Sequence, residues 1–228
     1  SPRHQDRDSH RPLVLSQHRV TAADLIRADA AAIIAADPRF ANADAESLPI
    51  EVWGGGFGPL IHLILGQQVS IEAADAMYLN LERHLGSVTP EGLLGLDDDT
   101  LRGCGFTRMK AEYGRGLAMA MLDCLDLEGL ADAPDDAVVD SLTALRGIGP
   151  WTAECYLIFC LGRRDVFPVG DLALRVGYQE IAGLDAQPTQ AEMAQHAESW
   201  APRRTAAAHL VWQSYLERRG RAASVPFV

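Results

Sequence analysis

Apolar residues recur every three to four positions along most of this chain, which is the spacing of one face of a helix. From residue 21 onward the pattern predicts helices almost throughout. The expected helices span residues 21–36, 57–67, 70–85, 90–95, 97–102, 107–122, 136–144, 150–161, 171–182, 189–198 and 203–219. Short β-like stretches such as 165–169 are followed too soon by helical sequence to build a sheet. The sequence therefore predicts an all-α protein.

Capping residues mark several of these helix starts. Thr21 with Asp24, and Thr189 with Glu192, have the spacing of a capping box, and Thr89 precedes a proline at the first helical position. Two stretches lack the helical pattern. Residues 1–20 are polar and predict a flexible tail, and the acidic stretch 123–136 predicts a solvated linker between helical layers.

Composition narrows the function classes. The chain has 228 residues, of which 48% are apolar and 22% charged, as expected for one large globular domain or two small ones. Its net charge of −11 disfavours nonspecific coating of DNA by long-range attraction. It leaves room for DNA binding through backbone N–H groups at a helix N-terminus, which need no basic surface.

Targeting and cysteine patterns point to a reducing compartment. No apolar run is long enough to cross a membrane, and residues 1–20 hold no apolar signal core, so we expect a cytoplasmic protein without a membrane partner. The four cysteines form no CxxC pair, which argues against structural zinc and an iron–sulfur cluster and favours free thiols. The glycines at 54–58 follow no strand and precede no Lys-Ser/Thr pair, so no nucleotide cofactor is expected.

The most informative segment is Leu145 to Ala153. Gly147 and Gly149 flank one apolar residue, and Pro150 stands at the favoured first position of the next helix. Such a tight hairpin exposes backbone N–H groups at a helix N-terminus, where a phosphate is favoured. A plain connection between two helices has the same local sequence, and the segment alone does not separate the two.

This segment resembles the helix-hairpin-helix motif of the DNA glycosylase superfamily. Residues 167–172 are similar to the Gly/Pro-rich loop that follows the hairpin there, and they put Asp171 at the position of the superfamily's carboxylate. Three further stretches resemble the 3-methyladenine DNA glycosylase II branch: 64–70, 101–111 and 200–212. Together these motifs cover roughly residues 50–215 in the right order.

The resemblance implies a two-lobed helical fold. Residues 57–165 would form the lobe that carries the hairpin, residues 21–56 and 166–228 would form the other, and the active-site cleft would lie between them. The branch's bacterial prototype has an N-terminal β-domain, and too few residues precede Gly66 here to build one. We therefore expect the short form of the enzyme, acting as a monomer.

The residue after Gly149-Pro150 predicts the reaction subtype. Superfamily members that also cut the DNA backbone have a lysine there, because an amine must attack the sugar. Trp151 occupies the position here, and the only lysine, Lys110, is assigned to another helix. The resemblance thus implies a monofunctional glycosylase that flips alkylated purines, such as 3-methyladenine and 7-methylguanine, out of double-stranded DNA in base excision repair. Alternatives are a glycosylase for oxidised or mismatched bases and a noncatalytic DNA-binding module.

The resemblance also assigns site residues. Asp171 would be catalytic, stabilising positive charge on the sugar, although its residue type equally suits the N-cap of the next helix. Gln68 and Gln67 would fill the gap left by the flipped base, or else hydrogen-bond to a helix end. The base pocket would be formed by Trp151, Trp212, Cys155 and Tyr156. Either tryptophan could instead belong to the core, and Cys155 replaces an aromatic residue of the prototype.

The hairpin carries the last two assignments. Its phosphate-binding residues would be Arg146, Gly147, Ile148, Gly149, Trp151 and Thr152. Backbone carbonyls of Thr143, Leu145 and Gly147 would cradle a monovalent cation, sodium or potassium, as in related enzymes. No other cofactor is implied.

Overall fold

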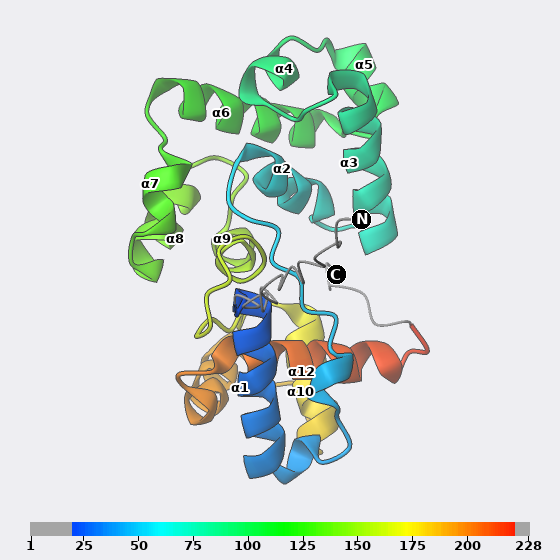
Figure 1. The fold of residues 1–228 in the computed structure, drawn as a ribbon. Helices are drawn as coiled ribbons and strands as arrows, with labels where there is room; N and C mark the ends of the chain where they lie inside the picture. Colours follow the sequence, from blue (N-terminus) through cyan, green and yellow to red (C-terminus); the bar gives the residue numbers. More distant parts are fainter. Residues whose placement is uncertain (1–19, 222–228) are drawn as a thin grey trace, which may run out of the picture.

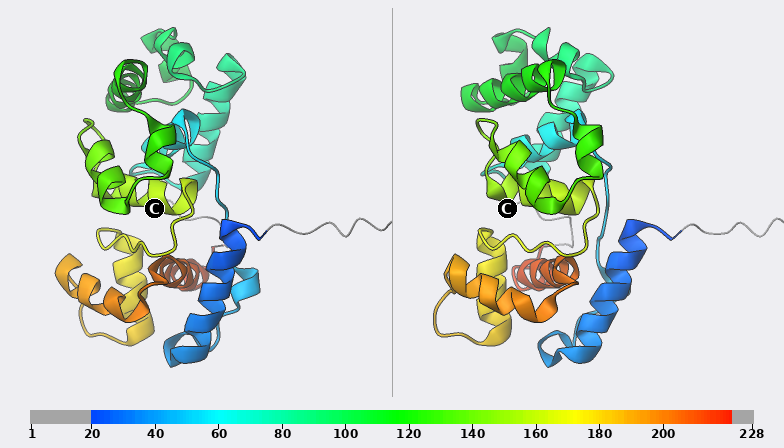
Figure 2. Two further views of the ribbon diagram at one scale, coloured as in Figure 1. Left: turned by 60° about the vertical axis from the view of Figure 1, so that its left-hand side comes forward. Right: turned by 90° about the vertical axis from the view of Figure 1, so that its left-hand side faces the viewer.

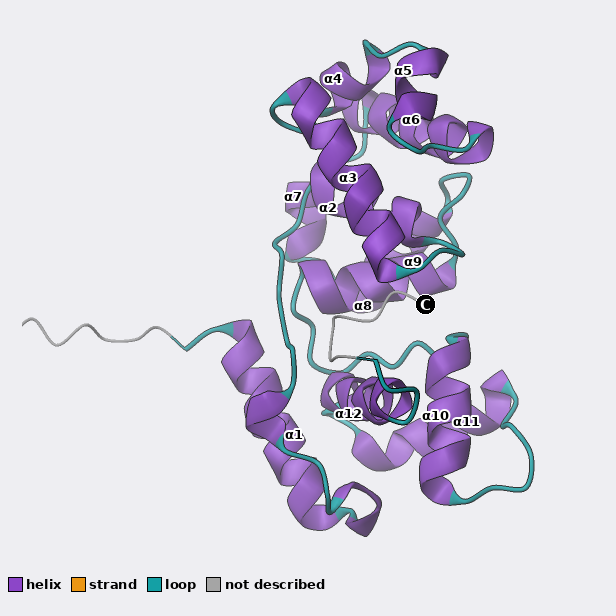
Figure 3. Cartoon of the chain, turned by 90° about the vertical axis from the view of Figure 1, so that its right-hand side faces the viewer, coloured by secondary structure: helices purple, strands orange, loops and turns teal. Residues whose placement is uncertain are grey.

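The computed structural model describes residues 20–221, and this part of the chain is helical without a single strand (Figures 1 and 3). The α-helices are α1 (Ala22–Ala36), α2 (Phe57–Gly66), α3 (Ile71–Leu85), α4 (Pro90–Leu94), α5 (Asp98–Gly103), α6 (Arg108–Asp123), α7 (Leu127–Ala131), α8 (Asp135–Thr143), α9 (Pro150–Cys155), α10 (Leu172–Ala182), α11 (Gln190–Ala197) and α12 (Arg204–Glu217). The all-α prediction is confirmed, with most helix ends within about two residues of those expected. The predicted tail lies almost wholly outside the described residues.

Capping chemistry explains where many helices begin. Thr21 and Thr189 form the two expected capping boxes. In each, the threonine side chain accepts the backbone N–H of the acidic residue three positions on, whose carboxylate accepts the threonine backbone N–H. Thr89 caps α4 ahead of its proline, as predicted. These local signals place the helix starts independently of the tertiary fold.

The helices fall into two groups in space. Figures 1 and 2 show α2 to α9 on one side and α1 with α10, α11 and α12 on the other. Within the first group α2 packs on α3 and α4 on α6, and within the second α12 packs on both α1 and α10. The exact division of the chain into lobes stays a prediction.

A shared core joins the two groups. After α9 the helix widens into one π-helical turn, η3 (Tyr156–Cys160), whose Phe159 ring stacks on Trp212 of α12 at 5.7 Å and on Trp53 at 5.6 Å. Trp53, in the segment that crosses between the groups, also donates its backbone N–H to the Phe159 carbonyl at 2.7 Å. Both Asp29 carboxylate oxygens on α1 also accept hydrogen bonds from Arg164, which lies between η3 and α10, at 2.7 Å.

The stretch 123–136 corrects one prediction. It contains α7, whose Leu127 is buried, and Arg163 donates to the carbonyls of Ala131 at 2.8 Å and Ala133 at 2.7 Å. The segment is therefore packed against the protein and is not a solvated linker. A five-residue helix with two leucines, Leu127 and Leu130, is too short for a periodic signal, which is why the pattern missed it. The single-turn 3₁₀ helices η1 (Pro38–Phe40) and η2 (Ala45–Ser47) escaped for the same reason.

Candidate functional site

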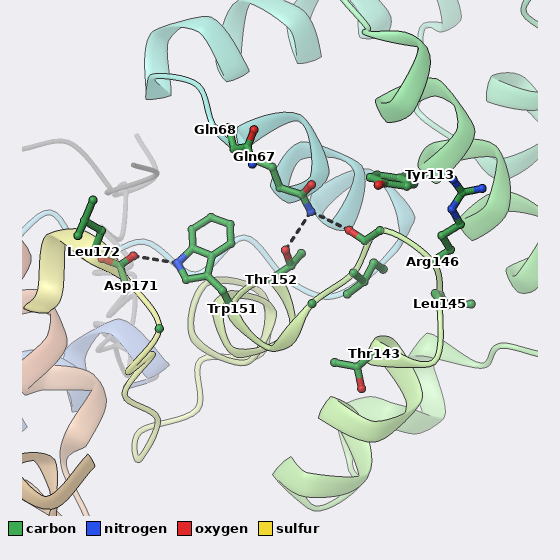
Figure 4. Close-up of a pocket in the computed structure, with 14 residues that line it drawn as sticks. Gln67, Gln68, Tyr113, Thr143, Leu145, Arg146, Trp151, Thr152, Asp171 and Leu172 are labelled. Atoms are coloured by element: carbon green, nitrogen blue, oxygen red, sulfur yellow. Dashed lines mark hydrogen bonds between the residues drawn. The ribbon is translucent and has the colours of Figure 1, made fainter. Parts of the chain in front are cut away.

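A cleft of about 860 Å³ lies where the two groups of helices face each other (Figure 4). Three segments line it. The first is the turn after α2, residues 67–68, and the second is the hairpin wall, residues 143–149 between α8 and α9. The third is the carboxylate wall, residues 170–172, at the start of α10. The first turn of α9, with Trp151, joins the two walls.

Asp171 is held rigidly in this cleft. It is the N-cap of α10, where its Oδ1 accepts the Leu174 N–H at 2.9 Å, while its Oδ2 accepts the indole N–H of Trp151 at 2.8 Å (Figure 4). Burial raises the pKa of this carboxyl, and the N–H donors of Leu174 and Trp151 oppose that rise. The carboxylate is thus both a helix cap and the wall of a cleft, so the two sequence interpretations of Asp171 are compatible.

The two tryptophans predicted for the base pocket lie in different places. Trp151 is half-buried and lines the cleft, with its indole N–H directed at Asp171. Trp212 is 1% exposed and does not line the cleft, because it stacks on Phe159 inside the core. The Trp212 indole N–H has no hydrogen-bond partner among the described residues, but its proximity still acts to lower the pKa of the Asp171 carboxyl.

Cys155 and Tyr156 also belong to the core, which corrects their assignment to the base pocket. Both are fully buried. The Tyr156 hydroxyl accepts the Gly56 backbone N–H at 3.1 Å and so holds the glycine-rich turn before α2. Burial raises the pKa of the Cys155 thiol well above its usual range, with a further contribution from Asp171. A π-helical turn begins at Tyr156, and no pattern in the sequence indicates it.

Glu154 was not predicted for the site. It lies one helical turn beyond Trp151 on α9 and is largely buried. Burial, and then the charge of Asp171, raise the pKa of Glu154 to about 7. A second carboxyl group that protonates near neutral pH therefore stands in the neighbourhood of Asp171. Its spacing of three from Trp151 is the only sequence signal that would have found it.

The two glutamines of the turn after α2 have separate environments. Gln68 is exposed, lines the cleft, and has a positive φ of 59°. Gln67 instead directs its amide into the hairpin, donating to the Gly147 carbonyl at 2.9 Å and to the Thr152 hydroxyl at 3.0 Å (Figure 4). The gap-filling prediction is therefore corrected for Gln67, whose donors are already used, and is retained for Gln68.

The hairpin owes its shape to its two glycines. Gly147 has a φ of 92°, and a Cβ at this position would overlap the ring of Tyr113, which packs against it. Gly149 is exposed, and a Cβ there would meet nothing within 4 Å. Backbone near Gly149 is thus open toward the cleft, whereas backbone at Gly147 is pressed against the protein.

The other predicted hairpin residues divide between surface and interior. Arg146 is exposed, and its Nη1 lies 3.7 Å from Oε2 of Glu112. Such an exposed ion pair is weak, so the guanidinium group is able to turn toward a phosphate. Ile148 is buried and anchors the hairpin in the core. Thr152 is 2% exposed and its hydroxyl accepts from Gln67, so its predicted role in phosphate binding is left to its backbone N–H.

Two of the three carbonyls expected to hold a monovalent cation also accept hydrogen bonds from the protein. The Leu145 carbonyl accepts the Ile148 N–H at 3.1 Å, and the Gly147 carbonyl accepts the Gln67 amide. Only Thr143 of the three is without such a competing bond among those described. A carbonyl oxygen that accepts one hydrogen bond keeps a second lone pair, so the monovalent-cation site stays a prediction.

Lys110 stands away from the cleft. This only lysine of the chain lies on α6, is 8% exposed, and donates from Nζ to the Leu65 carbonyl at 2.6 Å near the end of α2. Burial lowers the pKa of its ammonium group. Within residues 20–221, no helix has the length and apolar character that a membrane crossing needs.

Comparison with known families decides what this arrangement represents. Residues 61–203 match the model described as HhH-GPD superfamily base excision DNA repair protein, and this range includes the hairpin and Asp171. The chain belongs to the HhH-GPD superfamily. The matched range starts in α2 and ends just before α12, so it takes in all three segments that line the cleft.

Individual relatives in the superfamily carry alkylation-repair names. DNA-3-methyladenine glycosylase 1 of Schizosaccharomyces pombe is 34% identical over 160 residues, covering 68% of this chain and 70% of that one. A crystal structure of DNA-3-methyladenine glycosidase from Bacillus halodurans superimposes with a TM-score of 0.70 at 31% identity, covering 86% of this chain and 93% of that one. Schizosaccharomyces pombe Mag1 in complex with abasic DNA gives a TM-score of 0.66 at 32% identity, covering 73% and 82%.

Proposed function

We propose that this protein is a monofunctional DNA glycosylase that excises alkylated purines of the 3-methyladenine and 7-methylguanine type from duplex DNA during base excision repair. The observation that carries the proposal is Asp171, a buried carboxylate fixed by two hydrogen bonds in a cleft opposite an open hairpin. A module that only bound DNA would gain nothing from a negative charge there, since it repels phosphate. The names of the relatives support the alkylpurine class.

The mechanism assigns binding to the hairpin wall. Backbone N–H groups around the exposed Gly149 bind the phosphates beside the lesion, and Arg146 adds a charged contact. The damaged nucleotide rotates out of the stack, and Gln68 enters the space that it leaves.

The chemical step is assigned to the carboxylate wall. As the N-glycosidic bond lengthens, positive charge develops on the sugar, and the Asp171 carboxylate stabilises it and orients the attacking water. The hydrogen bonds from Leu174 and Trp151 favour the ionised form that this role needs. Lys110 is buried against Leu65, so no lysine amine is available for a Schiff base, and the product is an intact strand with an abasic site.

Trp151 is the aromatic group through which the enzyme would select charged bases. Its ring lines the cleft, whereas Trp212 lies in the core. Replacement by Phe or by Leu removes the same indole N–H from Asp171, and only Phe keeps an aromatic face. On cationic 3-methyladenine, we expect Trp151→Leu to lose roughly 0.5–2 kcal/mol more transition-state stabilisation than Trp151→Phe. On neutral hypoxanthine, we expect the two variants to lose the same amount. Single-turnover excision rates of the two variants on the two lesions measure this difference. The same Leu-to-Phe rate ratio on both lesions would exclude charge recognition by this ring.

A lesion panel tests the reaction itself. Duplexes carrying 3-methyladenine, 7-methylguanine, 1-methyladenine, hypoxanthine, uracil or 8-oxoguanine are incubated with the protein and then divided, one half being treated with alkali. We expect strand breaks for the alkylated purines, and only after alkali. Release of 8-oxoguanine or uracil alone would favour the oxidised- or mismatched-base alternative, breaks without alkali would indicate a lyase, and binding without any release would indicate a noncatalytic module.

A further inference from the structure

Gln67 ties the turn after α2 to the hairpin wall and to α9. Its Nε2 group donates to the Gly147 carbonyl at 2.9 Å and to the Thr152 hydroxyl at 3.0 Å (Figure 4). One acceptor belongs to the hairpin and the other to the first turn of α9, so they lie on either side of Gly149. A single amide thus holds three segments whose contacts are 80 and 85 residues apart in sequence.

The turn that Gln67 begins has a backbone that needs support. Gln68 is the only residue other than glycine within residues 20–221 with a positive φ, 59°. Side chains disfavour this left-handed region, so the surrounding structure must hold it. Two bonds do so: the Gln67 amide on the hairpin, and Lys110 Nζ on the Leu65 carbonyl in the last turn of α2 at 2.6 Å.

The neighbouring side chains divide the work. Gln67 is half-buried, and its amide donates to two acceptors that the rest of the protein fixes in place. Gln68 is exposed toward the cleft, and no hydrogen bond of its side chain is present in the described part of the chain. One glutamine is anchored and the next is free to enter DNA.

We propose that Gln67 is a positioning residue that couples phosphate binding by the hairpin to insertion of Gln68 into the duplex. This inference rests on the proposed function. The Gly147 carbonyl and the Thr152 hydroxyl hold the Gln67 amide in a set position relative to the phosphate that the hairpin binds. The strained turn is then held in its inserting conformation. Both bonds require N–H donors, so a side chain of the same shape without donors leaves the hairpin and the turn uncoupled.

The test compares Gln67→Met with a matched pair at the acceptor, Thr152→Val and Thr152→Ser. Met keeps the length of Gln without its donors, Val keeps the shape of Thr without the hydroxyl, and Ser keeps the hydroxyl. Insertion is read from 2-aminopurine fluorescence beside a tetrahydrofuran abasic analogue in a duplex. Binding to undamaged duplex is read from anisotropy, the fold from thermal melting, and excision under single turnover.

We expect Gln67→Met to bind undamaged duplex within about threefold of wild type and to lose about tenfold or more in insertion and excision. Thr152→Ser should behave as wild type and Thr152→Val should share the Met defect in part. The double variant Gln67→Met/Thr152→Val should be no worse than Gln67→Met alone, because both changes break one link.

Wild-type insertion by Gln67→Met, or losses that add in the double variant, would overturn the coupling. If Gln67→Met fails to fold, the Thr152→Ser and Thr152→Val pair decides, since equal insertion by the two excludes the link. Failure of the proposed function has a different signature. In that case wild type inserts into the abasic duplex yet releases no base from any lesion, and the coupling is still judged by fluorescence.

Discussion

The two walls of the cleft are built in opposite ways. The hairpin wall presents exposed backbone at Gly149, with no side chain between its N–H groups and an approaching phosphate. The carboxylate wall presents Asp171, which is 4% exposed and held by two hydrogen bonds. Backbone N–H donors suit the phosphate group, which is the same at every nucleotide. A fixed carboxylate suits the positive charge that develops on the sugar only in the transition state. Binding and chemistry should therefore be separable by mutation.

The largest expected effect separates them directly. Asp171→Asn keeps the helix cap, because asparagine is as good an N-cap as aspartate, and it removes the charge. We expect excision to fall by about 10²–10³-fold or more while duplex binding stays within about threefold. Single-turnover excision and fluorescence anisotropy on the same duplex measure the two, and near-normal release by this variant would remove Asp171 from the mechanism.

Breaking the hairpin wall from inside should unfold it. Gly147→Ala places a Cβ against the Tyr113 ring at a φ of 92°, so we expect the free energy of unfolding to drop by roughly 3 kcal/mol. Urea unfolding followed by circular dichroism provides the measurement. Tyr113→Ala in the Gly147→Ala background should restore part of the loss; no restoration would mean that backbone strain alone accounts for it.

Glu154, a neighbour of the carboxylate wall, makes the free energy of unfolding of the protein depend on pH. Its pKa rises from 4.5 to about 7 on folding, so the folded state binds the proton more tightly than the unfolded chain. That contribution to stability is fully present below pH 4.5 and is lost as pH rises through 7. Glu154→Gln should therefore gain on wild type over this range, by roughly 2–3 kcal/mol at pH 8.

Urea titrations at several pH values test this, with Glu51→Gln as the control at an exposed glutamate. A Glu154→Gln curve parallel to wild type would show that Glu154 does not retain its proton.

The smallest effect sharpens the comparison from the hairpin side. Gly149→Ala adds a methyl group in open space at a φ of −93°, which alanine adopts readily, so stability should stay within about 0.5 kcal/mol. The methyl group occupies the approach of a phosphate, and we expect all duplexes to bind about three- to tenfold more weakly. Competition between damaged and undamaged duplexes is the control: an altered lesion preference would contradict phosphate binding here.

The sequence predicted the helices well because capping boxes, prolines and a 3.6-residue period are local signals. It missed α7, a helix of five residues that is too short to show a period. It also missed the π-helical turn at Tyr156–Cys160, whose hydrogen bonds are chosen by tertiary packing and leave no pattern. That turn directs Tyr156 into the core, so one unforeseen backbone feature accounts for part of the error in the base pocket.

Within the site, residue type was predictable and direction was not. Asp171 could be placed at the cleft through the resemblance of residues 167–172 to the superfamily's loop, and its residue type also indicated the N-cap that the structure shows. Gln67 and Gln68 are the same residue type, yet Gln67 bonds to the hairpin while Gln68, with its positive φ, is exposed in the cleft. Trp151 and Trp212 likewise share a residue type, and they are distinguished by which helix face meets the core.

The single buried lysine has a consequence for how this protein can be handled and modified. Lys110 is the only lysine side chain in the sequence, and it is 8% exposed with its Nζ bonded to a carbonyl. Succinimidyl esters and aldehyde fixatives thus find no lysine amine on the folded surface. Acetylation and ubiquitin transfer likewise have one lysine acceptor in the native state, and it is out of reach. Modification of Lys110 therefore requires local opening of the structure around the last turn of α2.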